Sequence, residues 1–270
     1  MKNINFSQKI LILDSGLGGL SVYKYLVRKL PNLSYTYVFD NEFFPYGNRK
    51  ESFIIKRVIR LIDQIQRDRE FEIIILACNT VSVVSINILK DIFSDYIILG
   101  SVPEIDVAIQ FTKNKVIYVL ATKRTIEYIR NKVSFYSKEF KIHLVSSSKL
   151  VRMIEEKIRG KIILKNKIYS ILKNLSNHQI PDTIVLGCTH YSFISKEIKE
   201  AFPKCINLID SKKNIYDDLT NYVYKRSKKK EYYDKYHENM VFFTKSDYKM
   251  KELSDFFKRI GFLKMKKITI

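Results

Sequence analysis

The chain has 270 residues, 46% of them hydrophobic, so it can fold as one large domain or two ordinary ones and is not globally disordered. It has no apolar run of 18 residues and no signal-peptide core, so we expect no membrane span and a cytoplasmic location. Its net charge of +20 fits either a nucleic-acid partner or a compositional bias toward residues with A/T-rich codons, such as Lys, Ile, Asn and Tyr.

Short apolar runs rich in β-branched residues alternate along the chain with amphipathic stretches. In 51–67, apolar residues recur at helical spacing. Such alternation is typical of parallel sheets covered by helices on both faces, and its extent indicates an α/β protein of two units. We predict buried strands at 9–14, 35–40, 72–77 and 96–100, and a second series at 115–121, 141–145, 182–187 and 206–210.

Two of these strands end in a similar sequence, EIIILACNT at 72–80 and DTIVLGCTH at 182–190. Cys78 and Cys188 lie just past the carboxyl ends of the strands, where open α/β sheets bind ligands. If two similar domains face each other, both thiols reach one cleft. A nearby helix N-terminus would lower the pKa of each thiol. Cys205 lacks such polar neighbours, and we assign it to the core.

Two facing thiols fit several kinds of chemistry. One thiol can remove a proton from a carbon while the other returns one to the opposite face, which inverts the configuration. Cys78, Cys188 and His190 could instead bind a metal ion, or the two cysteines could form a redox dithiol. A nucleophilic pair of Cys188 and His190 is too closely spaced to set a reliable geometry. The residues alone do not separate the two-base mechanism from a metal site.

The segment LDSGLGGLSV at 13–22 has the strand, glycine turn and helix of a phosphate-binding loop. The third glycine of a dinucleotide fingerprint is missing, and no Walker A motif follows. Asp14 would repel a pyrophosphate. An amino acid fits better, because its carboxylates can meet the backbone amides while its ammonium group tolerates Asp14.

Four motifs follow one another along the chain: DSGLGGLSV at 14–22, PYG at 45–47, ACNT at 77–80 and GCTHY at 187–191. They resemble those of the glutamate racemase family, and LIDS at 208–211 adds a fifth point of similarity. The resemblance covers nearly the whole chain, into VFFTKSD at 241–247. It implies an isomerase that makes D-glutamate for peptidoglycan without pyridoxal phosphate, metal or any other cofactor.

The resemblance also implies individual roles. Cys78 would take the α-proton of D-glutamate and Cys188 that of L-glutamate. Asp14 and His190 correspond to the carboxylate and imidazole that assist the first and the second thiol, and Glu155, in a looser motif, corresponds to a further catalytic acid. The implied substrate contacts are Asp14, Ser15, Tyr46, Gly47, Asn79, Thr80, Thr122, Thr189 and His190.

The family pattern further implies two doubly wound parallel-sheet domains with the active site in the cleft between them. The first would comprise 1–97 and 210–270, and the second 98–209. The family pattern leaves open whether a cell-wall precursor activates the protein and whether it forms a homodimer. The alternative substrate is aspartate or another amino acid. The alternative class is a basic nucleic-acid-binding protein, with the basic cluster at 224–230 as its binding site. Departures from the family near the inferred junction are Arg124, Glu104 and Asp106.

Overall fold

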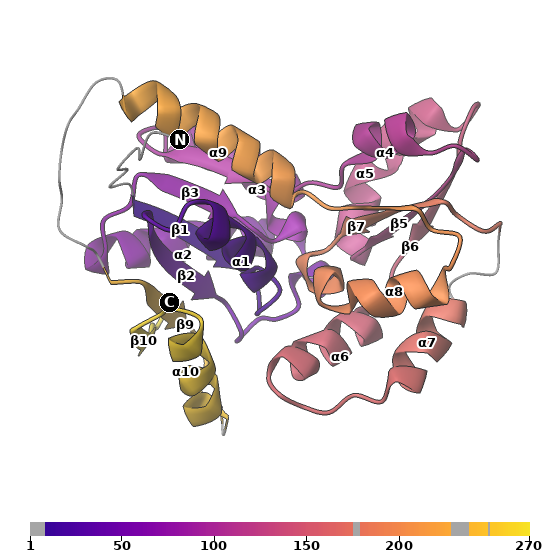
Figure 1. The fold of residues 1–270 in the computed structure, drawn as a ribbon. Coiled ribbons are helices and arrows are strands. Elements are labelled where there is room, and N and C mark those ends of the chain that lie inside the picture. Colours follow the sequence, from indigo (N-terminus) through magenta and orange to yellow (C-terminus); the bar gives the residue numbers. More distant parts are fainter. Residues whose placement is uncertain (1–8, 175–178, 228–237, 248) are drawn as a thin grey trace.

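The computed structural model describes residues 9–174, 179–227, 238–247 and 249–270 (Figure 1). The described strands form two sheets, in which every pairing is parallel. The larger sheet, in the order β10-β9-β2-β1-β3-β4, contains β1 (Lys9–Asp14), β2 (Ser34–Phe39), β3 (Ile73–Leu76), β4 (Ile97–Gly100), β9 (Met240–Phe243) and β10 (Lys264–Lys267). The smaller sheet, in the order β6-β5-β7-β8, contains β5 (Val116–Ala121), β6 (Lys141–Val145), β7 (Thr183–Gly187) and β8 (Asn207–Ile209).

The two sheets repeat one topology. The order β2-β1-β3-β4 in the first sheet matches β6-β5-β7-β8 in the second, as the sequence repeat predicts. Cys78 follows β3 and Cys188 follows β7, which are equivalent strands. All eight predicted strands are present, and the prediction of a doubly wound α/β fold is confirmed. The four-residue strands β9, MVFF, and β10, KMKK, were not predicted, and KMKK has the charged pattern of an edge strand.

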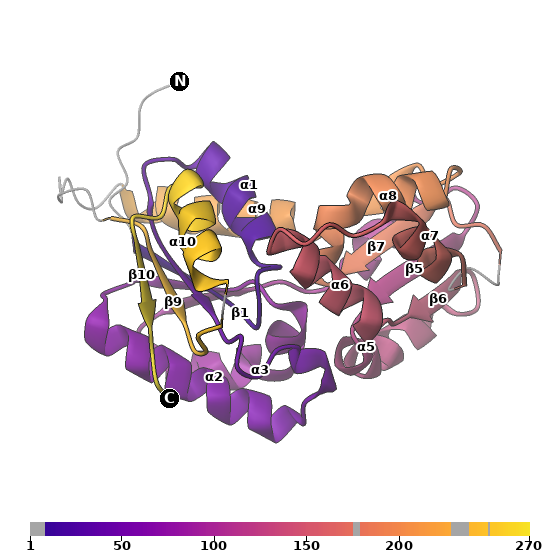
Figure 2. The same cartoon turned by 90° about the horizontal axis from the view of Figure 1, so that it is seen from below.

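Helices cover both faces of the first sheet (Figures 1 and 2). Alternate residues of each strand point to opposite sides, and apolar side chains on both sides are buried under these helices. Ile10 and Ile12 of β1 pack in one core cluster, and Leu11 and Leu13 pack in the other. The first cluster includes residues of α1 (Leu20–Lys29), α9 (Lys212–Ser227) and α10 (Met250–Arg259), and the second includes residues of α2 (Glu51–Asp68) and α3 (Asn79–Ile92).

The second sheet is covered in the same way. Tyr118 and Leu120 of β5 face one cluster, and Ile117 and Val119 face the other. One cluster includes α6 (Ser148–Ile158), α7 (Lys165–Asn174), α8 (Ser195–Ala201) and the 3₁₀ helix η2 (Thr189–Ile194), and the other includes α4 (Ile105–Phe111) and α5 (Lys123–Tyr136). A second 3₁₀ helix, η1 (Tyr46–Asn48), lies between β2 and α2.

The chain passes from the first sheet to the second after β4 and returns after β8. The two crossings meet where the hydroxyls of Ser101 and Ser211 share a hydrogen bond of 2.5 Å. Because β4 pairs with β3, a first crossing after Gly100 fits the strand pairing better than one after residue 97. The division into 1–97 with 210–270 and 98–209 stays a prediction.

Candidate active site

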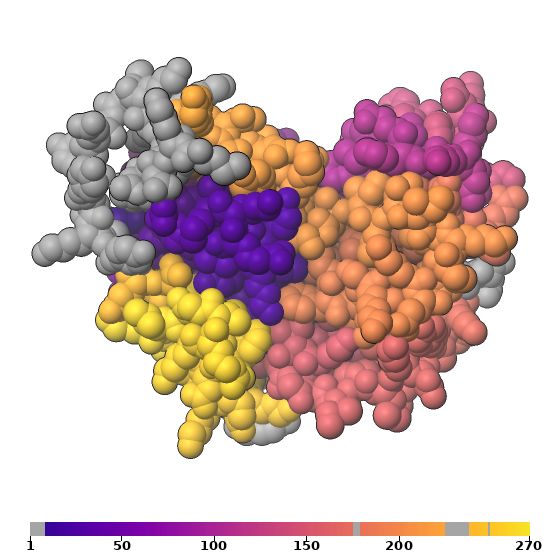
Figure 3. Space-filling model, viewed as in Figure 1, coloured from indigo at the N-terminus to yellow at the C-terminus, as the bar shows by residue number. Residues whose placement is uncertain are grey.

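A small cavity lies where the carboxyl ends of the two sheets face each other. All nine predicted substrate contacts line it, together with both cysteines that follow β3 and β7. On the face seen in Figure 3, atoms of the two halves touch across the middle of the molecule, and a notch separates them at the upper edge. The lining residues are Asp14, Ser15, Phe44, Pro45, Tyr46, Gly47, Cys78, Asn79, Thr80, Thr122, Val151, Cys188, Thr189 and His190.

The Cys188 thiol has an ionisable partner. Cys188 precedes η2, whose turn brings His190 Nδ1 to 3.7 Å from Cys188 Sγ. His190 Nε2 lies 2.9 Å from Glu155 Oε2, and the ring packs against Phe44. Burial alone would lower the pKa of the His190 imidazole, but its contacts with Cys188 and Glu155 outweigh burial and raise this pKa to about 10. His190 is therefore a cation near neutral pH.

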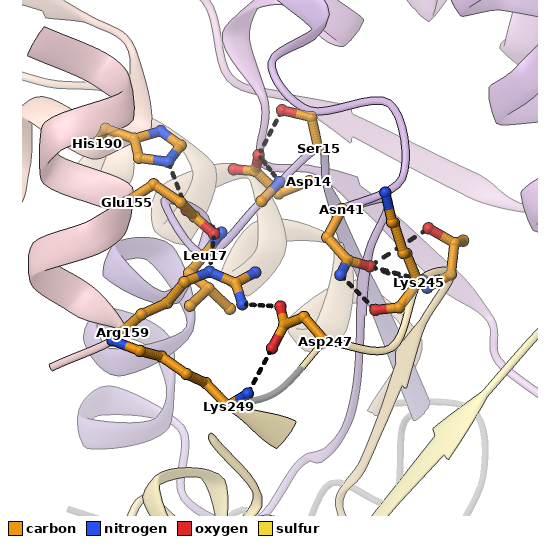
Figure 4. Close-up of polar contacts among 12 residues, drawn as sticks. Asp14, Ser15, Leu17, Asn41, Glu155, Arg159, His190, Lys245, Asp247 and Lys249 are labelled. Carbon is orange, nitrogen blue, oxygen red and sulfur yellow. Dashed lines mark hydrogen bonds and ion pairs between the residues drawn. The ribbon is translucent and has the colours of Figure 1, made fainter. Parts of the chain in front are cut away.

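Glu155 lies behind this histidine rather than in the cavity lining. It projects from α6, which begins where the Ser147 hydroxyl accepts a hydrogen bond from the Leu150 N–H. Its Oε2 atom also accepts a hydrogen bond of 2.8 Å from the Leu17 N–H, on the other side of the cleft. Its Oε1 atom accepts one of 3.0 Å from Arg159 Nε (Figure 4). Burial acts to raise the pKa of Glu155, but His190, Arg159 and the Leu17 amide together lower it.

The Cys78 thiol has different surroundings. Cys78 is the N-cap of α3, and the Ser15 hydroxyl lies 3.9 Å from its Sγ atom. The expectation of a lowered thiol pKa is wrong for Cys78, because burial and the neighbouring charge of Asp14 raise it well above its usual value. The Val81 N–H at the helix start acts in the expected direction but is outweighed.

Asp14, at the end of β1, binds across the cleft. Its Oδ2 atom accepts a hydrogen bond of 2.9 Å from the Thr189 hydroxyl. Its Oδ1 atom accepts hydrogen bonds from the Ser15 hydroxyl at 3.3 Å and the Gly16 N–H at 3.2 Å. Burial raises the pKa of Asp14. Asp14 therefore joins the two halves of the site, and its assistance to Cys78 stays a prediction.

Amide and hydroxyl groups fill the rest of the cavity wall. The hydroxyls of Thr80 and Thr122 lie 2.9 Å apart, and Thr125 completes a cluster with them. Asn79 donates a hydrogen bond from Nδ2 to the Ser101 hydroxyl. Its Oδ1 atom is buried and has no hydrogen-bond partner among the described residues. A buried acceptor without a partner is costly, so this atom is suited to bind a donor on a ligand.

The glycines of the 13–22 loop permit the close approach of the two halves. A Cβ atom at Gly18 would overlap the Thr189 hydroxyl and the His190 ring, and one at Gly16 would lie 2.8 Å from Glu155 Oε2. The loop therefore presents backbone to the opposite half of the cleft. This explains why it resembles a phosphate loop without the third glycine of one.

Two arginine contacts near the site were not predicted from the sequence. Arg57 of α2 donates hydrogen bonds of 3.0 Å from Nε and Nη2 to Asp40, which also accepts one from the Tyr46 hydroxyl at 2.5 Å. The signal was a basic residue inside the apolar stripe of 51–67. The other feature is the Arg159 contact, signalled only by its spacing of four residues from Glu155.

The other sequence hypotheses receive less support. Among the described side chains, no group of three or more His, Cys, Asp and Glu could hold a metal ion, and all three cysteines are free. No helix within the described ranges is long and apolar enough to cross a membrane. The basic cluster at 224–230 falls largely outside the described residues.

The residues that depart from the family pattern are placed as follows. Arg124 donates hydrogen bonds of 3.3 and 3.2 Å to the Arg49 carbonyl and so joins α5 to the end of η1. Asp106 pairs with Lys132 at the surface. Burial raises the pKa of Glu104. The Arg124 contact joins the two halves, and so does a hydrogen bond between the side chains of Glu104 and Asn214.

Comparisons with known proteins identify the family of the chain. No protein-family model matches the chain. It is 39% identical over 264 residues to the glutamate racemase of Buchnera aphidicola from Schizaphis graminum, covering 97% of this chain and 100% of that protein. It is 40% identical over 205 residues to that of Proteus mirabilis, covering 75% and 71%.

Solved structures indicate the same family. The chain is similar to Escherichia coli glutamate racemase in complex with L-glutamate and the activator UDP-MurNAc-Ala, with a TM-score of 0.88, 31% identity and coverage of 97% and 98%. It shares its fold with the Francisella tularensis enzyme in complex with D-glutamate, with a TM-score of 0.77, 23% identity and coverage of 97% and 98%. The chain therefore belongs to the glutamate racemase family.

Proposed function

We propose that this chain is a cofactor-independent glutamate racemase that interconverts L- and D-glutamate with two cysteines as base and acid. The observation that carries the proposal is that Cys78 and Cys188, which follow equivalent strands of two sheets, line one buried cavity. Inversion at Cα requires a base on one face and an acid on the other. Family membership supports glutamate as the substrate.

In the L to D direction, the Cys188 thiolate removes the α-proton and the Cys78 thiol returns one. The Cα–H bond breaks as an S–H bond forms on Cys188, and the S–H bond of Cys78 then breaks as the new Cα–H bond forms. A cationic His190 stabilises the thiolate beside it, and the raised pKa of Cys78 favours its protonated form. The D to L direction reverses both roles.

The predicted substrate contacts divide by chemistry. The hydroxyls of Ser15, Thr80, Thr122 and Thr189, together with backbone amides, suit the two carboxylates and the charge that develops beside Cα. Burial strengthens these interactions, since little water competes with them. Asp14 and the unpartnered Oδ1 atom of Asn79 suit the ammonium group. Tyr46, Gly47 and His190 complete the proposed set of contacts.

The proposed partners and location follow from the family and the thiols. The Escherichia coli relative was solved with UDP-MurNAc-Ala as an activator, and we expect an activator of this class and a role in supplying D-glutamate for peptidoglycan. Two reactive thiols require a reducing compartment, so we assign the protein to the cytoplasm. A homodimer stays a prediction.

Proton exchange tests this function. In metal-free and pyridoxal-free D₂O, the protein should convert either enantiomer of glutamate into the racemate and place deuterium at Cα. Aspartate measured in parallel should react far more slowly. Failure of both glutamate enantiomers to exchange would contradict the proposal, and faster turnover of aspartate would change the substrate.

A further inference from the structure

A run of charged side chains continues from the active-site histidine to the surface (Figure 4). Glu155 and Arg159 lie one turn apart on the same face at the end of α6. Arg159 Nε donates to Glu155 Oε1 at 3.0 Å, and Arg159 Nη1 lies 2.9 Å from Asp247 Oδ2. Arg159 therefore joins the carboxylate that holds His190 to an aspartate that follows β9 of the first sheet.

Asp247 is presented by an anchored turn. Asn41, just past β2, accepts hydrogen bonds at Oδ1 from the N–H groups of Thr244 and Lys245 and donates from Nδ2 to the Lys245 carbonyl. Asp247 itself accepts a hydrogen bond of 2.9 Å from the Lys249 N–H at its Oδ1 atom. Its other oxygen points to Arg159. The contact thus comes from a segment fixed to the first sheet.

The guanidinium suits this position better than an ammonium would. Its planar fork directs Nε to one carboxylate and Nη1 to another at the same time. The side chains of Arg159 and Glu155 are only 14% and 6% exposed, so their ion pair is screened less than a surface pair, whereas the pair with the 33% exposed Asp247 is screened more. Because Glu155 has one oxygen on His190 and the Leu17 amide and the other on Arg159, its plane is set from both sides.

We propose that Arg159, held by Asp247, is a positioning residue for the Cys188 half of the reaction, because it orients Glu155 against His190 when the two halves are closed. The proposal rests on the racemase function proposed above. The turn at 244–247 thereby links closure of the cleft to the acid–base group on one side of it. The C-terminal motif VFFTKSD, which no catalytic role accounts for, supplies this aspartate.

The positioning role predicts an effect confined to one half-reaction. L- and D-glutamate have equal free energies, so a variant must lower kcat/KM equally in both directions. Primary isotope effects with α-deuterated substrates can still differ. If steps at Cys188 slow down, the isotope effect should rise with L-glutamate, whose deuterium Cys188 removes, and fall with D-glutamate, whose deuterium Cys78 removes.

The test compares Arg159→Met and Asp247→Asn with the unaltered protein. We expect kcat/KM to fall on the order of 100-fold for Arg159→Met and about tenfold for Asp247→Asn, since small misplacements of catalytic groups are costly. Both variants should show the opposite changes in the two isotope effects. Arg159→Lys should recover only part of the rate. Lys157→Met is the matched control, because Lys157 lies on the same helix as Glu155 but pairs with Glu197 of α8.

Other outcomes overturn the proposal. Unchanged kinetics in Arg159→Met, or a loss of activity without a change in either isotope effect, would leave Arg159 with a structural role only. If Arg159→Met does not fold, Asp247→Asn decides alone, since Asp247 is partly exposed. An unaltered protein that fails to racemise glutamate would overturn the function and the positioning role together, whereas an active one leaves the function standing.

Discussion

The two cysteines occupy equivalent positions in a repeated fold but have unlike neighbours. Cys188 faces His190, and a run of charged groups continues through Glu155 and Arg159. Cys78 faces the Ser15 hydroxyl and the start of α3, and burial, together with the nearby charge of Asp14, raises the pKa of its thiol. The repeat has kept the position of the thiol and changed the group that tunes it.

This difference means that the two proton transfers are controlled by different physics. A cation next to Cys188 stabilises the thiolate by charge attraction. The strength of this attraction depends on how the groups around the cation are oriented and ionised. At Cys78, burial favours the neutral thiol, so a thiolate there depends on the substrate and on local dipoles. The two enantiomers of the substrate have equal free energies, but the protein surrounds the two thiols differently. Variants that alter the surroundings of one thiol can reveal this difference.

The largest effect should come from removing either thiol. Cys78→Ala and Cys188→Ala should each lower racemisation on the order of 10 000-fold, because each removes a base in one direction and an acid in the other. Polarimetry or circular dichroism of glutamate measures the rate. Cys205→Ala is the control, since that buried thiol donates to the Asn207 carbonyl away from the cavity. A single active-site variant with full activity would refute the two-base mechanism.

Gly18→Ala should affect both halves at once. Its Cβ atom would overlap the Thr189 hydroxyl and the His190 ring, so the cleft could not close on the substrate. We expect kcat/KM to fall about 1000-fold, since two sets of groups are displaced. Thermal unfolding should show that the halves still fold. The ratio of the primary isotope effects measured with α-deuterated L- and D-glutamate should change little. A change in only one of these isotope effects would mean that closure of the cleft serves one thiol only.

The sequence predicted the repeated strands and the position of the two thiols, because both depend on local pattern, whereas the other residues that line the cavity were implied by the resemblance to the family. Apolar runs mark β1 and β5, and a polar motif follows each strand end. The Arg159–Asp247 contact was not predictable, because it joins segments 88 residues apart through side-chain geometry alone. The pKa of Cys78 was predicted in the wrong direction, since a helix start can be seen in a sequence while the depth of burial cannot.

His190→Asn should lower kcat/KM about 100-fold and remove a pH dependence of stability. The pKa of His190 rises from 6.5 to about 10 in the folded protein, so the folded state binds this proton more tightly. The resulting stabilisation is complete below about pH 6.5 and is lost as the pH rises through about 10. Urea unfolding from about pH 6 to about pH 10 should therefore show a steeper decline in the free energy of unfolding for the unaltered protein than for the variant.

His143, on β6 outside the cavity lining, provides the control for the loss of activity. His143→Asn should keep the racemase activity of the unaltered protein. Equal slopes for the unaltered protein and His190→Asn would contradict a cationic His190, and the contrast between the two thiols would then rest on geometry alone.

Ser15→Ala should have the smallest effect and the opposite signature. The contact between the Ser15 hydroxyl and Cys78 Sγ is a weak, neutral one at 3.9 Å, and Ser15 is one of several proposed hydroxyl contacts to the substrate, so we expect kcat/KM to fall only about tenfold. Because Cys78 removes the α-proton of D-glutamate, the primary isotope effect should rise with α-deuterated D-glutamate and fall with the L enantiomer. This reverses the pattern expected for Arg159→Met. The same pattern in both variants would mean that the two thiols share one rate-limiting environment despite their unlike neighbours.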